Sequence, residues 1–250
     1  MATTAGKVET VYQDALVNYL VSMARTVESS VNKALDALSS RDFPIATALA
    51  SDIFMLEPRV NEMEMVIDEH AVRLLRAGQL SDDDVRFVVA TLKITNDLER
   101  MGDLAVNLAE RVISLAQMPP AAPPRELEPM AGAVRAMVGK SLGGLLFRNV
   151  VLAAEVLESD DVVDRYRDRI FERLLAHMTE DPGQVAPDFQ FVLATRYMER
   201  IADHATNIAE DIIFWLRGLD VRHGRGRAGA AEASAAVTEN SSSRDASLNR

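Results

Sequence analysis

Carboxylate and amide side chains recur in a segment that occurs twice in the chain, 100 residues apart. Residues 94–115 read ITNDLERMGDLAVNLAERVISL, and residues 194–215 read ATRYMERIADHATNIAEDIIFW. The copies share Thr95/Thr195, Glu99/Glu199, Arg100/Arg200, Asp103/Asp203, Ala105/Ala205, Asn107/Asn207, Ala109/Ala209, Glu110/Glu210 and Ile113/Ile213. Most of these are charged or amide residues, which the packing of an apolar core does not require. The duplication therefore indicates a repeated architecture with a polar face that could have a function.

The helical phase of this segment separates apolar from polar residues. Apolar residues share the side expected to face the core, namely Met101, Ala105, Leu108 and Val112 in the first copy and Ile201, Ala205, Ile208 and Ile212 in the second. Polar residues share the other side, namely Glu99, Asp103, Asn107 and Glu110, and Glu199, Asp203, Asn207 and Glu210. We therefore expect the polar side chains to lie on an outer face, away from the core.

A polar pair with the same spacing of four precedes each copy. The two pairs are Glu57 and Asn61 in LEPRVNEM, and Asp160 and Asp164 in SDDVVDRY. Val60 and Val163 support the comparison, because each directly precedes the second polar residue of its pair. In each repeat, this pair could meet the Glu-x3-Asp pair of the repeated segment.

Such a gathering of carboxylates suggests a cation site. Carboxylates at i and i+4 repel one another by about a few tenths of a kcal/mol on a bare helix, and a multivalent cation would convert this repulsion into attraction. Ligand sets of oxygen atoms suit Mg²⁺, Ca²⁺, Mn²⁺ or iron. Asn61 replaces a carboxylate, so we expect a weaker site in the first repeat. The alternative is a solvated acidic face whose charge Arg100 or Arg200 neutralises.

Other kinds of chemistry have less support in the sequence. The four histidines, His70, His177, His204 and His223, are scattered, and the Glu-x2-His signature of di-iron bundles is missing. For His204 we favour a surface position over metal ligation. No nucleotide-binding glycine motif and no arrangement typical of a catalytic nucleophile occurs. The sequence therefore predicts a protein that is not an enzyme.

The composition narrows the class of protein. The chain has 250 residues, no cysteine and a formal net charge of −11. This acidity argues against nucleic-acid binding, which needs a concentrated basic surface. The N-terminus lacks the apolar run of a signal peptide, and no apolar stretch is long enough to span a membrane. We therefore expect a cytoplasmic protein.

Helical periodicity with breakers between the segments predicts an all-α fold of six long helices. They cover about residues 11–38, 44–77, 81–118, 130–147, 149–179 and 189–219, with a kink or break at Pro58 and a loop at 180–188. Short connections favour two tandem antiparallel three-helix bundles. The predicted units are a first bundle at 11–118, a proline-rich linker at 119–129, a second bundle at 130–218 and a disordered tail at 219–250.

Four segments resemble the PhoU family of bacterial phosphate-signalling proteins. These are VNEMEMVIDEHAVRLL (60–75), LERMGDLAVNLAE (98–110), DDVVDRYRDRIFERLL (160–175) and MERIADHATNIAE (198–210). The resemblance implies a cytoplasmic homodimeric regulator that represses phosphate uptake and the phosphate-starvation response. It implies an adaptor between the ATPase of the phosphate ABC transporter and a sensor histidine kinase, peripheral to the membrane only through these partners.

The same resemblance implies metal binding and no catalysis. Some family members bind iron or other metal ions through a Glu/Asp-x3-Asp motif in each bundle, and zinc, manganese and magnesium are further candidates. The motif falls on Glu57, Glu99 and Asp103 in the first repeat, and on Asp160, Asp164, Glu199 and Asp203 in the second. Two other functions stay open at this point, a carboxylate-bridged metalloenzyme and a structural protein with a solvated acidic face.

Overall fold

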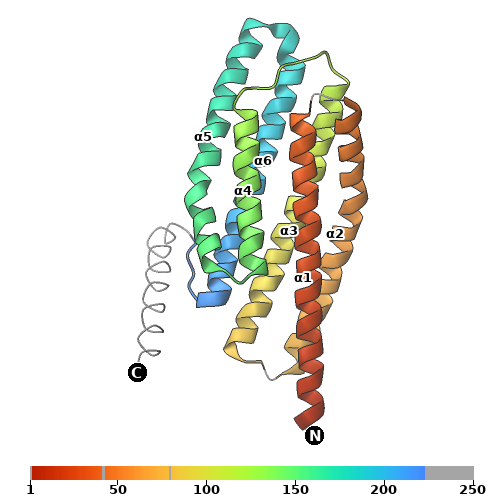
Figure 1. Ribbon diagram of the computed structural model, residues 1–250, viewed down its shortest axis with the longest axis vertical. Helices are drawn as coiled ribbons and strands as arrows, with labels where there is room; N and C mark the ends of the chain where they lie inside the picture. The colour runs from red at the N-terminus through yellow and green to blue at the C-terminus, as the bar shows by residue number, and fades with distance from the viewer. Residues whose placement is uncertain (1, 41–42, 79, 223–250) are drawn as a thin grey trace, which may run out of the picture.

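The computed structural model describes residues 2–40, 43–78 and 80–222. Within these residues the chain forms six long α-helices: α1 (Ala2–Ser39), α2 (Phe43–Ala77), α3 (Asp82–Ala116), α4 (Leu127–Leu146), α5 (Val150–Glu180) and α6 (Val185–Arg217). A short 3₁₀ turn, Pro182–Gln184, precedes α6. Figure 1 shows the helices running up and down along the long axis of the molecule. The prediction of six helices in two tandem antiparallel three-helix bundles is confirmed.

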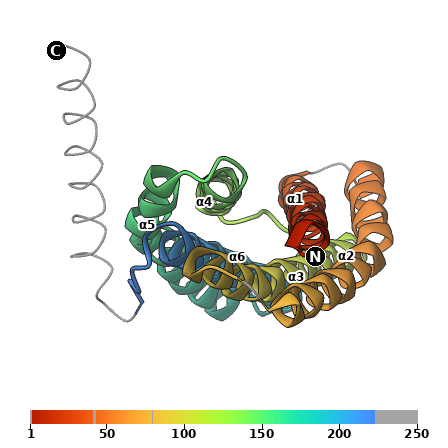
Figure 2. The same ribbon diagram turned by 90° about the horizontal axis from the view of Figure 1, so that it is seen from below.

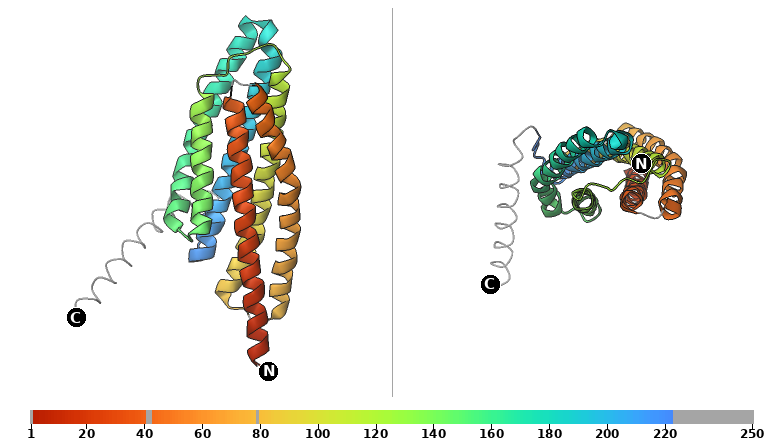
Figure 3. Two further views of the ribbon diagram at one scale, coloured as in Figure 1. Left: turned by 45° about the vertical axis from the view of Figure 1, so that its right-hand side comes forward. Right: turned by 90° about the horizontal axis from the view of Figure 1, so that it is seen from above.

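The two bundles pack side by side through their last helices. Helices α1 to α3 form the first repeat and α4 to α6 the second, and α3 packs along α6. Seen along the long axis, α3 and α6 lie in the centre, with α2 and α5 at opposite ends and α1 and α4 on the same side (Figure 2). The additional views show the same elongated, curved arrangement (Figure 3). The duplicated segments thus lie back to back at the junction of the repeats.

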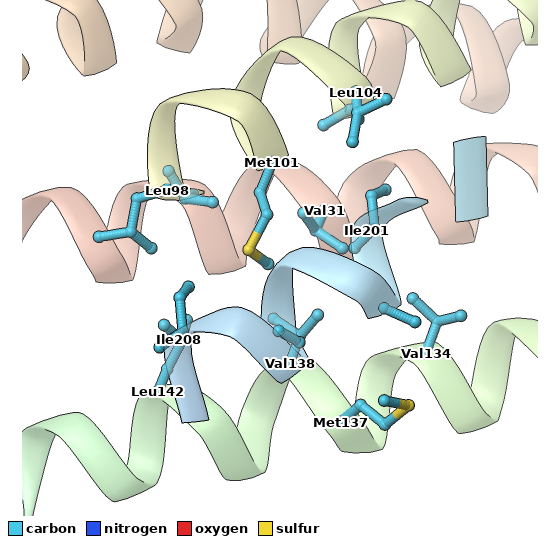
Figure 4. Packing of buried hydrophobic residues seen from close by; sticks show 14 of the residues in the cluster. Val31, Leu98, Met101, Leu104, Val134, Met137, Val138, Leu142, Ile201 and Ile208 are labelled. Atoms are coloured by element: carbon cyan, nitrogen blue, oxygen red, sulfur yellow. The ribbon is translucent and has the colours of Figure 1, made fainter. Parts of the chain in front are cut away.

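One hydrophobic core extends through both repeats. The core cluster includes Met101 of α3, Ile201 of α6, Val31 of α1 and Val134 of α4, so all four helices contribute to it (Figure 4). All four side chains are fully buried. Full burial of one such side chain stabilises a fold by about 1.5–3 kcal/mol relative to exposure. Because the apolar faces of both repeats meet in this core, the repeats form one unit.

The two-repeat arrangement is also fixed on the side of α1 and α4. Arg135 of α4 donates hydrogen bonds to Asn32 (3.0 Å) and Asp36 (2.5 Å) of α1.

Within the described residues, none of the helices is both long and apolar enough to cross a bilayer. The charged residues spread along each helix interrupt the apolar stretches.

Helix α1 begins at Ala2, well before the predicted start at about residue 11, and prolines account for two smaller differences from the predicted boundaries. Helix α6 begins at Val185 and includes most of the C-terminal half of the predicted loop, and α4 begins at Leu127, inside the predicted linker. Pro187 and Pro129 stand in the first turns of these helices, where a backbone N–H has no intrahelical acceptor and a proline is tolerated. Helix α2 also continues through Pro58, so a break there is wrong, and the alternative of a kink stays a prediction.

The end of α6 extends the ordered part of the chain beyond the prediction. Gly218 adopts a left-handed conformation with φ of 68°, which ends the helix. Val221 then folds back and is only 3 % exposed, although a disordered tail was predicted from residue 219. An apolar side chain close behind the helix can complete the core edge. The rest of the predicted tail, residues 223–250, lies outside the described residues.

Candidate functional site

The four predicted carboxylates of the second repeat lie together, on α5 and α6. We call Asp160, Asp164, Glu199 and Asp203 the second-repeat cluster. Partial burial raises the pKa of Asp203, and so do the charges of Glu199, Asp160 and Asp164. Burial likewise raises the pKa of Asp160, with Asp164 as the next cause. The carboxylates of α5 and α6 in this repeat therefore act on one another electrostatically, and their role as a metal site stays a prediction.

The predicted outer position of Glu199 is wrong. This residue is only 6 % exposed, whereas Asp203 on the same helix is exposed. The outer position was inferred from the helical phase of one helix alone. In the structure, α5 packs against α6 over the face that was expected to meet solvent. The carboxylate of Glu199 therefore lies between α5 and α6, where a missing counter-charge would be costly.

Arginines hold the buried side of the second-repeat cluster. Arg167 Nη1 donates to Asp164 Oδ1 at 2.7 Å and to Glu199 Oε1 at 2.6 Å. Arg196 Nη1 donates to the same Glu199 oxygen at 2.7 Å. Sequence reasoning named Arg200 as the neutralising residue of this repeat, and the structure assigns that role to Arg167 and Arg196.

The corresponding cluster of the first repeat has a different composition. Asp103 lies beside Glu99 on α3, and Glu64 of α2 joins them. Burial raises the pKa of Glu99, with the Asp103 carboxylate next in importance. Burial also raises the pKa of Glu64, and Asp68 and Asp103 add to the effect. We call Glu64, Glu99 and Asp103, together with Glu57 and Asn61 of α2, the first-repeat cluster.

Four members of this cluster were expected, and one, Glu64, was missed. Glu57 accepts a hydrogen bond of 2.6 Å from Asn61 Nδ2, so the predicted pair is formed within α2. Glu64 was missed because it falls outside the repeated spacing of four. Its position seven residues after Glu57 places it on the same helical face, and that spacing could have revealed it.

Two acceptor atoms in the first-repeat cluster lack hydrogen-bond donors. Asn61 Oδ1 and Glu99 Oε2 are both buried and accept no hydrogen bond. Arg100 forms ion pairs with Glu99 Oε2 at 3.3 Å and with Asp103 Oδ2 at 3.7 Å, and its own side chain is 53 % exposed. A buried acceptor without a donor costs about 1–3 kcal/mol. A cation or a donor that reached these oxygens would remove that cost.

The positions of these side chains can be compared with the cation sites expected from the sequence. Among the side chains that the structure describes, no three of the histidine, aspartate and glutamate groups are arranged to hold one ion. In the first repeat, Asn61 Oδ1 and Glu99 Oε2 accept no hydrogen bond and have the chemistry that a hard cation prefers, although Arg100 forms an ion pair with Glu99 Oε2. In the second repeat, the oxygens of Glu199 and Asp164 already accept hydrogen bonds from arginine. The expectation that the first repeat holds the weaker cation site stays a prediction.

A further polar network joins α3 to α6 and was not predicted. Asp97 Oδ1 accepts a hydrogen bond of 3.2 Å from Asn207 Nδ2 and lies 2.7 Å from His204 Nδ1. The His204 side chain is only 16 % exposed, so the expected surface position is wrong. Lys93 of α3 also donates to Asp211 of α6 at 2.9 Å. These contacts connect the repeats close to Asp203 of the second-repeat cluster.

Comparisons with known proteins give the same repeat pattern. The PhoU domain matches residues 20–112 and 127–212. A Pseudomonas aeruginosa protein named phosphate-specific transport system accessory protein PhoU homolog is 35% identical over 209 residues, 82% of this chain and 84% of that protein. A protein of the same name from Aquifex aeolicus is 33% identical over 204 residues, 82% of this chain and 90% of its own length.

Solved structures agree with the fold. The crystal structure of PhoU from Pseudomonas aeruginosa superimposes with a TM-score of 0.78 and 32% identity, over 84% of this chain and 99% of that chain. The phosphate transport system regulatory protein PhoU from Streptococcus pneumoniae gives a TM-score of 0.75 at 23% identity, over 86% of this chain and 100% of that chain. The second likeness concerns the fold alone. Both chains are covered almost completely, so the similarity includes both repeats.

Proposed function

The chain belongs to the PhoU family, and from this premise we propose that it is an accessory regulator of a phosphate transport system. The observation that carries the proposal is 35% identity across both repeats with a relative named for that role. We place the protein in the cytoplasm as a homodimer. It restrains phosphate uptake and represses the phosphate-starvation two-component response by connecting the transporter ATPase with a sensor histidine kinase.

The physical form of the molecule supports an adaptor. The repeats share one core, and α3 packs along α6, so a partner bound to one repeat has a fixed position relative to the other. The relatives are named as accessory proteins, and no catalytic role is proposed. The protein would therefore act by binding its partners.

The test of this function is a deletion strain that carries a reporter of the phosphate-starvation response. In phosphate-rich medium, loss of the protein should activate the reporter and raise phosphate uptake several-fold, and the intact gene should reverse both. A deletion strain with normal uptake and a silent reporter would exclude the regulatory role. The dimer is tested separately by light scattering of the purified protein, for which a mass of one chain would contradict it.

We further propose that a cation binds at the first-repeat cluster. No three carboxylates are arranged around one point in the described structure, so Glu57, Glu99 and Asp103 would have to turn towards the ion, with Glu64 and Asn61 Oδ1 beside them. The bound ion would neutralise the repulsion between these carboxylates and connect α2 with α3. Asp160, Asp164, Glu199 and Asp203 offer a second position, but an ion there would compete with Arg167. Iron, zinc, manganese and magnesium are the candidates.

Elemental analysis of the purified protein tests this part. Protein expressed with each candidate metal should carry about one ion per chain, and the Glu99→Gln variant should carry none. Glu62→Gln, an exposed residue on α2, is the matched control and should keep the ion. Equal metal content in wild type and Glu99→Gln would exclude the first-repeat site.

A further inference from the structure

Glu64 and Arg167 occupy corresponding positions in the two repeats. Val60 of α2 and Val163 of α5 are both fully buried and mark equivalent points of these helices. Four residues later the first repeat has Glu64, and the second has Arg167. Arg167 donates a hydrogen bond to the repeated glutamate of the next helix, Glu199, whereas the charge of Glu64 contributes to the raised pKa of the corresponding Glu99. The repeats thus differ in the sign of one charge at one structural position.

Arg167 is held on three sides. Its Nη1 atom bridges α5 and α6 by donating to Asp164 and Glu199, and its Nε atom donates to Asp168 at 2.9 Å. The Arg167 side chain is 21 % exposed and that of Glu199 is 8 % exposed. A guanidinium stays protonated at every physiological pH and presents its donors in a fixed plane. A charge in this position is therefore permanent and directional.

Among the described residues, the first repeat has no equivalent positive charge on α2, and its arginine, Arg100, lies on α3 and is half exposed. Glu64 adds a carboxylate where the second repeat has the guanidinium, and Arg100 approaches Glu99 and Asp103 from the solvent side, with a side chain that is 53 % exposed. Two buried acceptor oxygens are left there without donors. In the second repeat, neither Glu199 nor Asp164 has such an atom among those identified.

We propose that Arg167 is the resident cation of the second repeat, replacing a metal ion between Asp164 and Glu199. Metal dependence is then confined to the first repeat, and the two repeats have unequal roles. The second repeat keeps its α5–α6 contact whatever the supply of ions. The statement about the first repeat rests on the cation site proposed above, whereas the role of Arg167 in the second repeat is independent of it.

The experiment compares wild type with Arg167→Gln, which removes the charge but keeps a side chain able to donate a hydrogen bond. Arg165→Gln, an exposed position on the same helix, is the matched control. Thermal unfolding is recorded in EDTA and with MnCl₂, and bound Mn²⁺ is counted after equilibrium dialysis. In EDTA, Arg167→Gln should melt about 4–8 °C below wild type, because Glu199 loses one of its two arginines. With Mn²⁺ it should recover most of this loss and bind about one ion more than wild type.

A second variant separates the role of Arg167 from the first-repeat site. Glu199→Gln with Arg167 intact should bind as much Mn²⁺ as wild type, whereas reduced binding would show that the second repeat already holds an ion and would overturn the proposal. Equal melting temperatures of Arg167→Gln and Arg165→Gln would also overturn it. If wild type binds no Mn²⁺, the first-repeat site fails for this ion, but recovery of Arg167→Gln by Mn²⁺ would still establish Arg167 as the substitute cation.

Discussion

Asp97 of α3 and His204 of α6 meet across the junction of the repeats, with 2.7 Å between Asp97 Oδ1 and His204 Nδ1. The same aspartate oxygen accepts a hydrogen bond from Asn207, and the Asp97 residue is only 8 % exposed. One carboxylate of the first repeat therefore satisfies two polar side chains of the second. This connection does not depend on the apolar core and fixes how α6 is positioned along α3.

The junction predicts a loss of stability on substitution of Asp97. Asp97→Ala leaves His204 and Asn207 without their acceptor and should lower the free energy of unfolding by about 1–3 kcal/mol. Urea unfolding followed by circular dichroism measures the change. Asn96→Ala, at the exposed neighbouring position, is the control and should stay within about 0.5 kcal/mol of wild type. Equal effects of the two substitutions would exclude a structural role for the Asp97 network.

The lowered pKa of Glu126 leads us to expect that the free energy of unfolding depends on pH. Burial alone would raise the pKa of Glu126, but hydrogen bonds from Arg173 and Arg125 outweigh it and lower the pKa from 4.5 to about 2. A carboxyl with a lowered pKa stabilises the fold fully above its ordinary pKa, and this contribution disappears as the pH falls towards 2. Glu126→Gln should therefore cost about 1–3 kcal/mol at pH 7 and progressively less below pH 4.5.

The Glu126 prediction is measured as the difference in urea unfolding between wild type and Glu126→Gln at pH 7, 4 and 2.5. Using the difference removes the contribution of other carboxylates. Glu128→Gln, at an exposed position in the first turn of α4, serves as control. A difference that stays constant over the whole pH range would contradict the proposed ion pair.

The raised pKa of Glu99 leads us to expect the opposite dependence of stability on pH when no metal is present. Burial and the Asp103 carboxylate raise the pKa of Glu99, so its ionised form opposes folding, and stability should increase as the pH falls towards that pKa. Glu99→Gln should accordingly melt at the same or a higher temperature than wild type in EDTA at pH 7. It should also lose any increase in melting temperature that Mn²⁺ produces in wild type. A lower melting temperature of Glu99→Gln in EDTA would show that the ionised carboxylate stabilises the fold.

Two glycines in α4 predict opposite effects of the same substitution. A methyl group at Gly144 would lie 3.2 Å from the Asn149 carbonyl oxygen and 3.5 Å from Ile212 Cδ1, whereas one at Gly139 would have no atom within 4 Å. Gly144→Ala should therefore cost about 1–3 kcal/mol through crowding. Gly139→Ala should stabilise the protein by about 0.5–1 kcal/mol, because alanine is the better helix former. Urea unfolding checks both, and a stabilising Gly144→Ala would show that α5 can move away from α4.

Much of the fold could be predicted from the sequence because its determinants are local. The apolar spacing of the segments and the turns between them give the helices, and the repeated segment gives two bundles. Boundaries differed where a proline stands in a first helical turn, as Pro129 and Pro187 do, because a proline marks either a loop or a helix start. The buried position of Val221 was missed because one apolar residue has no periodicity.

The candidate site could be predicted only in part, because its details depend on contacts between helices. The meeting of Asp160 and Asp203 followed from the matched registers of the repeats. The burial of Glu199 depends on how α5 packs against α6, and the helical phase of a single helix contains no information on that contact. The contrast of Glu64 with Arg167 lies outside the repeated motif. The junction was missed because Asp97 corresponds to Tyr197 in the other copy, so the duplication gives no signal there.

We propose above all that the chain connects a phosphate transporter to a sensor kinase. The most direct test immobilises the cytoplasmic part of the kinase and measures retention of the transporter ATPase with and without this protein, in the presence of Mn²⁺. We predict that micromolar protein retains the ATPase on the kinase and that no retention occurs without it. If the protein binds neither partner under these conditions, or binds each only in competition with the other, the adaptor function is contradicted.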